Sequence, residues 1–298
     1  MPALPLPIRR LLPNPVRGFL CCTVITLSGC AAVFTAAHSP VAHEQVRYDN
    51  VAIETLVQGR GPAVVMLPSL GRDGLEDFDT VAESLAASGF KVLRPQPRGV
   101  GKSSGPMVGQ DLNHFARDVA EVIDRLGDGK AVIVGHAFGH FIARMTAMKY
   151  PTKVRGVVLA AASAKDTAER NPKVWATPVI AGDLSLPDAQ RLAALELGFF
   201  APGNSPKPWL GGWHPAVSKM QREKRVPLSE WWSAGSAPLL ELIPEDDPFK
   251  PRDRWDELKV EYGPRVTVVT IPKSSHALFI EQPVVVAKAI ADWSKRLP

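Results

Sequence analysis

Cysteine is scarce in this chain of 298 residues, and its three copies all lie near the N-terminus: Cys21, Cys22 and Cys30. Residues beyond Cys30 therefore offer no disulfide, no cysteine-ligated metal site and no thiolate nucleophile. Thiol chemistry is excluded from the functions that we consider for the body of the chain.

Runs of basic residues are also missing after the N-terminal segment. The net charge is +5, but three of these charges, on Arg9, Arg10 and Arg17, lie in the first twenty residues and leave +2 for the rest. Binding of nucleic acid normally requires a dense cluster of Lys and Arg. We therefore expect a small-molecule substrate or ligand as the partner, and no nucleic acid.

The N-terminal segment itself has the pattern of an export signal. Its basic residues precede an apolar run over residues 19–27, and Leu27-Ser28-Gly29-Cys30 resembles the bacterial lipobox, in which the cysteine is acylated after cleavage before it. The run is shorter than the roughly 20 residues that a permanent membrane span needs. We predict an export signal over residues 1–29, a tether over residues 30–44, and a periplasmic or membrane-anchored lipoprotein attached through Cys30.

Two alternatives stay open for this segment. The signal could be an ordinary secretory one that is cut nearer Ala36-Ala37, or it could remain as an uncleaved anchor.

From Gln45 onward, short apolar runs alternate with amphipathic helical patterns. This alternation is typical of an α/β protein with a mostly parallel sheet that is covered by helices on both faces. Helices are expected over residues 75–88, over residues 111–126 with Asp111 as the N-cap, over residues 138–150, and from Pro283 to the C-terminus. Strands are expected over residues 46–57 (a strand or hairpin), 63–67, 91–93, 131–134, 154–160, 238–243 and 265–271.

The alternation stops between residues 164 and 236, which are rich in proline, glycine and tryptophan. A helix start with a capping pattern at Ser185-Leu186-Pro187-Asp188 indicates helices joined by ordered loops. We predict a core over residues 45–163 and 237–298 with a helical lid over residues 164–236, whose aromatic side chains line an apolar cavity. The alternative is a subdomain that serves packing only. The segment holds five of the seven tryptophans: Trp175, Trp209, Trp213, Trp231 and Trp232.

A five-residue turn, Gly135-His136-Ala137-Phe138-Gly139, joins the strand at 131–134 to the next helix. With serine at position 137 it would be the G-x-S-x-G turn that exposes a catalytic hydroxyl at the edge of a parallel sheet. The methyl group of Ala137 cannot act as a nucleophile.

Five segments in this order resemble the α/β-hydrolase family over residues 45–298. They are Leu67–Gly71 after the first buried strand, Pro97–Ser103 in place of a D-x-R-G-x-G-x-S loop, the turn at 135–139, and the pair Pro244–Pro248 and Ser275–Ala277, which follow late strands. The ordered set is more specific than any one of its parts. The resemblance implies an α/β-hydrolase sheet with a lid inserted between core strands, and no cofactor.

The same resemblance assigns the site. Ala137 takes the nucleophile position, Asp247 (with Asp246 as the fallback) is the acid, and His276 is the histidine that the acid orients. Backbone N–H groups would form the oxyanion hole, one from Phe138 and the other from the loop at Ser69 and Leu70.

Alanine at position 137 has three explanations. It could be an engineered replacement of serine, a natural feature of a branch of bacterial hydrolase-like proteins, or a sign that another serine attacks. Ser69 is the best placed of these serines, and each of them is more often a turn residue. The other candidates are Ser103, Ser274 and Ser275.

The predicted function is hydrolysis of a small apolar ester or acyl substrate, with His276 and Asp247 assisting the attack. Without a nucleophile in the chain, His276 would activate water directly. The alternative is a catalytically silent binding or sensing protein on the same fold. The sequence leaves the oligomeric state open.

Two further patterns are rejected. Gly99-Val100-Gly101-Lys102-Ser103 evokes a phosphate loop, but Gln96 stands where its first glycine is required. His136 and His140 have the spacing of two metal ligands, but His136 lies on the turn and no Glu follows it. No metal site is predicted, and His136 is expected to pack beneath the turn.

Overall fold

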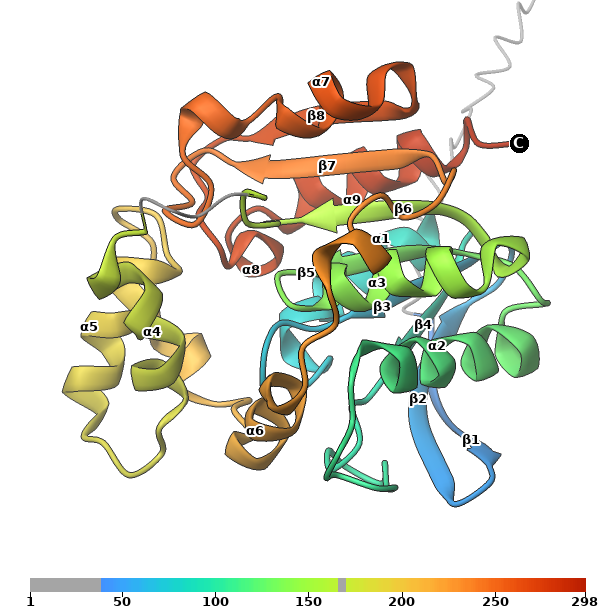
Figure 1. Cartoon of the computed structure of the whole chain (residues 1–298), viewed down its shortest axis with the longest axis horizontal. Coiled ribbons are helices and arrows are strands. Elements are labelled where there is room, and N and C mark those ends of the chain that lie inside the picture. Colours follow the sequence, from blue (N-terminus) through green and yellow to red (C-terminus); the bar gives the residue numbers. More distant parts are fainter. Residues whose placement is uncertain (1–38, 166–169) are drawn as a thin grey trace, which may run out of the picture. The chain divides into compact units, whose positions relative to one another are not determined.

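The computed structural model describes residues 39–165 and 170–298, and within them a single sheet of eight strands forms the core (Figure 1). The spatial order is β1-β2-β4-β3-β5-β6-β7-β8. The first two strands pair antiparallel with each other, β2 pairs antiparallel with β4, and the remaining neighbours are parallel. The strands are β1 (Val41–Tyr48), β2 (Val51–Gly59), β3 (Ala63–Leu67), β4 (Lys91–Pro95), β5 (Ala131–His136), β6 (Val154–Ala160), β7 (Leu239–Pro244) and β8 (Val266–Ile271).

The central strands are buried on both faces, as their apolar sequences predict. Every residue of β3 and of β5 is buried, which is typical of a parallel sheet that has helices on each side. Because these strands run in parallel, their carboxyl ends meet at one edge of the sheet. The loops that follow β3, β5, β7 and β8 carry the predicted site residues, so the topology brings these loops to the same edge.

Helices cover both faces of the sheet through two separate clusters of buried side chains. Those of one cluster come from α1 (Asp79–Ala87), α8 (Leu278–Glu281) and α9 (Pro283–Ser294). Those of the other come from α2 (Leu112–Leu126), α3 (Gly139–Lys149) and α7 (Glu257–Tyr262). The predicted N-cap of α2 is confirmed, because the Asp111 side chain accepts hydrogen bonds from the backbone of Asn113 and His114.

Between β6 and β7, the described residues form three α-helices, and we call residues 170–236 the insert. In Figure 1, the arrowheads of β6 and β7 point toward α4 (Pro172–Gly182) and α5 (Asp188–Gly198), and α6 (Pro215–Glu223) follows them. The capping pattern predicted at Ser185 is wrong, because α5 begins at Asp188 and the Ser185 hydroxyl bonds to Asp183 instead. The insert has a small apolar core, to which Ala277 from outside the insert also contributes. Its role as a lid stays a prediction.

The first strand corrects the predicted tether. β1 begins at Val41, so residues 41–44 belong to the hairpin with β2, and not to a linker. These residues are exposed on an edge strand, which explains why they lack the apolar signal of a buried strand. The predicted export signal at 1–29, the tether at 30–38 and Cys30 lie outside the described residues. Among the described residues, no helix has the length and apolar character needed to cross a membrane.

Candidate active site

The turn after β5 is a sharp strand–turn–helix junction. Ala137 has a φ of +46°, in the left-handed region that a residue with a side chain seldom adopts. The flanking glycines allow this geometry: a Cβ on Gly135 would lie 2.5 Å from backbone atoms of Gly139, and one on Gly139 would lie 2.5 Å from the Leu67 carbonyl oxygen. The chain therefore keeps the backbone of a nucleophile turn although the hydroxyl is absent.

His276 and Asp247 are in contact. The His276 Nδ1 lies 3.0 Å from Asp247 Oδ2, and Asp247 Oδ1 accepts a hydrogen bond of 2.9 Å from the Phe249 amide. Because a carboxylate oxygen accepts hydrogen bonds, Nδ1 is the donor in this contact, and Nε2 is the ring nitrogen left for a water or a substrate. Asp246, the fallback acid, is exposed, and Asp247 is the acid that contacts His276.

A cavity of about 120 Å³ joins these groups. Both Ala137 and His276 line it, although 139 positions separate them in the chain. The insert contributes four lining residues, but only two of the five tryptophans predicted to face the cavity. The other lining residues are mostly apolar. The full lining is Ser69, Leu70, Ala137, Phe138, His140, Phe141, Ala161, Ser163, Trp175, Pro178, Phe199, Trp213, Phe249 and His276.

The remaining tryptophans pack elsewhere. Trp209 lies in the apolar core of the insert, and Trp231 and Trp232 join the cluster beneath α2 and α3. Arg144 packs over Trp232 at 4.0 Å from the ring centroid. Composition alone could not separate these structural tryptophans from those of the cavity.

Backbone N–H groups are available where the oxyanion hole is predicted. Phe138 directly precedes α3, so its amide lies at the positive end of that helix. Among the described residues, the amides of Ser69, Leu70 and Phe138 have no hydrogen-bond acceptor. The assignment of these residues to an oxyanion hole stays a prediction.

Of the four serines considered as alternative nucleophiles, only Ser69 lines the cavity. The Ser274 hydroxyl donates to the Ile271 carbonyl at 2.9 Å, and that of Ser275 donates to the Asp246 carbonyl at 3.1 Å. Ser103 donates to Gln96 and accepts from the backbone of Glu54. These three hydroxyls hold loops in place.

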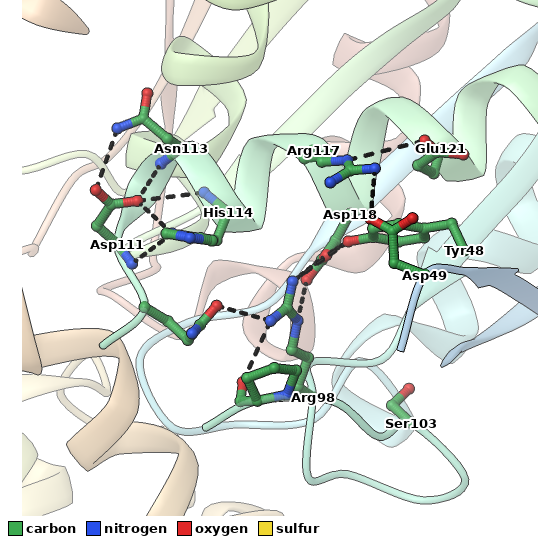
Figure 2. Close-up of polar contacts among 12 residues, drawn as sticks. Tyr48, Asp49, Arg98, Ser103, Asp111, Asn113, His114, Arg117, Asp118 and Glu121 are labelled. Carbon is green, nitrogen blue, oxygen red and sulfur yellow. Dashed lines mark hydrogen bonds and ion pairs between the residues drawn. The ribbon is translucent and has the colours of Figure 1, made fainter. Parts of the chain in front are cut away.

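The loop at 97–103 is held by a buried polar group that we call the Arg98 cluster: Tyr48, Arg98, Gln110 and Asp118 (Figure 2). Arg98 Nε and Nη2 donate to the two carboxylate oxygens of Asp118 at 2.9 and 2.7 Å, and Nη1 donates to Gln110 at 2.7 Å. The Tyr48 hydroxyl also bonds to Asp118. Burial raises the pKa of Asp118 although Arg98 opposes this shift. The motif at 97–103 therefore anchors a loop.

Both histidines of the rejected metal pair are buried. The Nε2 of His136 donates to the carbonyl oxygen of His276 at 2.7 Å, so His136 links the turn after β5 to the loop that carries His276. Burial, together with the neighbouring His276, lowers the pKa of His136 to about 3. His136 thus stays neutral and packs beneath the turn as expected.

The insert is attached to the loop after β3. Arg72 follows Ser69 and Leu70 and forms a two-point ion pair with Asp77 at 2.7 and 2.9 Å. Its guanidinium lies 4.1 Å from the ring centroid of Trp209 and 4.9 Å from that of Trp213. The predicted oxyanion loop and the insert therefore share one buried cation.

Comparison with known proteins agrees with the fold. The alpha/beta hydrolase fold family matches residues 62–283. The chain belongs to this family. The pyrethroid hydrolase of Sphingobium wenxiniae is 27% identical over 240 residues, which cover 73% of this chain and 82% of that protein. The soluble epoxide hydrolase of Corynebacterium sp. is 31% identical over 103 residues, which cover only 35% of each chain.

Solved α/β-hydrolase structures resemble the chain in fold. A putative aryl esterase from Burkholderia cenocepacia superposes with a TM-score of 0.71 at 20% identity, covering 85% of this chain and 98% of that one. A membrane phospholipase A gives a TM-score of 0.69 at 19% identity, with 86% and 87% covered. The family and the relatives that are named hydrolases support a hydrolase.

The cavity residues that sequence reasoning missed include His140, Ser163 and Phe249. The sequence could have predicted His140 as a cavity residue. It lies three positions after Ala137, on the first turn of α3, and residues with this spacing lie on the same side of a helix. Ser163 and Phe249 lie on loops whose path no periodicity predicts.

Proposed function

We propose that the chain hydrolyses an ester or related acyl bond of a small, largely apolar substrate by direct attack of water, with His276 as the general base. One observation carries this proposal. His276, paired with Asp247 at 3.0 Å, lines the same cavity as Ala137, where the methyl group leaves the position of a hydroxyl vacant. A water has room in a cavity of about 120 Å³, because a water occupies about 30 Å³ in the liquid.

The proposed reaction balances without a covalent intermediate. His276 Nε2 takes a proton from water as the water oxygen bonds to the acyl carbon, and Asp247 stabilises the imidazolium that forms. The amides of Phe138 and of Leu70 or Ser69 hold the negative oxygen. The bond to the leaving group then breaks, and His276 returns the proton to the leaving oxygen.

The lining of the cavity supports an apolar substrate. Aromatic side chains from the insert and from the core, including Trp175, Phe199 and Phe249, surround the space above Ala137. Such a lining favours the apolar part of an acyl group, whereas the few polar groups orient the reacting bond. Relatives that are named hydrolases are in line with this reaction class.

The proposal is tested with a panel of 4-nitrophenyl esters and a fluorophosphonate probe on three proteins: the unsubstituted chain, Ala137→Ser and His276→Ala. We expect turnover without labelling in the unsubstituted chain, labelling only after Ala137→Ser, and loss of turnover in His276→Ala. Turnover that survives His276→Ala would refute the role of His276. Labelling of the unsubstituted chain would identify another nucleophile, with Ser69 the first to examine.

The binding or sensing alternative makes a different prediction for the same proteins. A silent member of the family would show no ester turnover in the unsubstituted chain, while the apolar cavity would still bind 4-nitrophenol with quenching of Trp175 and Trp213. The two functions are thus separated by one assay.

We also propose export and lipidation at Cys30, on the strength of the sequence Leu27-Ser28-Gly29-Cys30. In a bacterial host, the full chain should incorporate radiolabelled palmitate and fractionate with membranes. Cys30→Ser should lose both properties, whereas Cys22→Ser should keep them. Equal labelling of all three proteins would contradict the assignment.

A further inference from the structure

His140 is a buried polar residue in the cavity that the proposed reaction does not use. It lines the same space as Ala137 and His276, and its side chain is 1% exposed. The ring nitrogen Nδ1 has no hydrogen-bond partner among the described residues. Buried polar atoms are nearly always paired, because an unpaired one has lost its hydration without replacement.

The contrast with His136 shows that burial alone does not explain why a histidine nitrogen lacks a hydrogen-bond partner. His136 is equally buried, four positions earlier, and its Nε2 is satisfied by the carbonyl oxygen of His276. The ring of His140 is held by aromatic contacts, with centroids 4.2 Å from Phe141 and 6.3 Å from Trp231. These contacts fix the ring in place beside the cavity.

Burial, assisted by nearby cations, keeps this ring neutral. Burial lowers the pKa of His140 well below its ordinary value, and the neighbouring cations Arg144 and Lys250 and the His276 ring act in the same direction. A neutral imidazole has one nitrogen that accepts a hydrogen bond, and a protonated one has none. A neutral His140 can therefore accept a hydrogen bond from an O–H group.

We propose that His140 is a second catalytic residue, which holds the attacking water above the methyl group of Ala137. This inference rests on the proposed function. One O–H of the water points to His276 Nε2, which removes that proton, and the other O–H donates to His140 and stays in place. The water oxygen then directs its lone pair at the acyl carbon. No proton moves to His140, so the balance of the reaction is unchanged.

Two substitutions at position 140 test this role. His140→Phe keeps a ring against Phe141 and Trp231 but removes both nitrogens, and it should lower kcat for 4-nitrophenyl butyrate about tenfold with KM changed less than twofold. His140→Asn restores a polar atom where Nδ1 lies and should recover most of this loss. His43→Phe, the same replacement at an exposed histidine, serves as the matched control.

The outcomes separate this inference from the proposed function. Turnover that is lost in His276→Ala but unchanged in a folded His140→Phe overturns the role of His140 alone. Absence of turnover in the unsubstituted chain overturns both. If His140→Phe does not fold, the ¹⁵N shifts of His140 are measured in the unsubstituted protein while butyrate displaces the water. We expect them to change, and unchanged shifts overturn the inference.

Discussion

Two buried polar sites in this molecule differ in how completely their hydrogen bonds are made. In the Arg98 cluster, every guanidinium nitrogen has an acceptor, and Asp118 and Tyr48 bond to the same group (Figure 2). In the cavity at the sheet edge, the amide of Phe138 and Nδ1 of His140 have no partner among residues 39–165 and 170–298.

The difference separates two uses of polar groups inside a protein. A closed network has nothing left to offer a ligand, so the Arg98 cluster serves to fix the loop at 97–103. An incomplete network costs stability until a ligand or water completes it, so the chain gains nothing from it unless the cavity binds something. The left-handed φ of Ala137 is a further feature of the cavity, since local backbone strain also tends to occur at functional sites.

The strongest test of this comparison replaces a buried aspartate by asparagine at each of the two sites, beginning with Asp247 at the cavity. Asp247→Asn should lower kcat/KM about 10²–10⁴-fold, because an amide N–H facing Nδ1 forces the proton of His276 onto Nε2, which then cannot act as a base. The free energy of unfolding should change by less than about 1 kcal/mol, since the shape and the bond from Phe249 remain. Ester turnover and urea denaturation measure the two quantities.

The same replacement in the Arg98 cluster should have the opposite profile. Asp118→Asn removes the charge that balances the buried Arg98, and the free energy of unfolding should fall by about 3 kcal/mol. The turnover of the folded protein should be unaffected, because the cluster does not line the cavity. A loss of activity comparable to that of Asp247→Asn would show that the two sites are not separate.

Much of this arrangement could be predicted from the sequence. The strand–helix alternation fixed the order of the elements, and with it the edge at which Ala137, Asp247 and His276 meet. Those three positions follow strands, and the resemblance to the α/β-hydrolase family supplied their expected roles. The hairpin start at Val41 was missed because an exposed edge strand carries no apolar pattern.

The completeness of a hydrogen-bond network could not be predicted in this way. Arg98 and His140 both look like ordinary polar residues near a motif, and only three-dimensional contacts distinguish the satisfied one from the unsatisfied one. The same holds for Arg72, whose partners Trp209 and Trp213 come from the insert far along the chain. Such pairings depend on how loops return to the core, which local sequence does not encode.

The two sites should also differ in how stability depends on pH, because buried histidines lie beside the cavity and the Arg98 cluster contains none. The pKa of His136 is about 3 in the folded protein, against about 6.5 in an unfolded chain. Between these values the unfolded state binds a proton that the folded state does not. His136 alone should therefore make the free energy of unfolding fall as the pH is lowered from 6.5, with a contribution to the slope that approaches about 1.4 kcal/mol per pH unit.

His136→Gln should make this dependence shallower, because the amide can still donate to the His276 carbonyl but does not titrate. Urea denaturation at several pH values between 7 and 5 measures the slope for both proteins. Equal slopes would mean that His136 does not contribute to the acid sensitivity.

The smallest effect concerns the strain at Ala137. Ala137→Gly removes a left-handed penalty of about 1–2 kcal/mol but also a buried methyl group worth about 0.8 kcal/mol. We expect the free energy of unfolding to stay constant or to rise by up to about 1 kcal/mol. Ala289→Gly, in the middle of α9, should instead lower it by about 0.5–1 kcal/mol.

The difference between these two alanines is the quantity to measure, because both lose the same methyl group. If Ala137→Gly is as destabilising as Ala289→Gly, then the turn after β5 is not strained, and the contrast with the relaxed Arg98 cluster rests on hydrogen bonds alone. If the free energy of unfolding of Ala137→Gly is higher than that of Ala289→Gly by about 1 kcal/mol or more, the chain keeps a strained backbone conformation at a position where it has no nucleophile. Such a cost is reasonable when the same turn still directs the amide of Phe138 at a reacting oxygen.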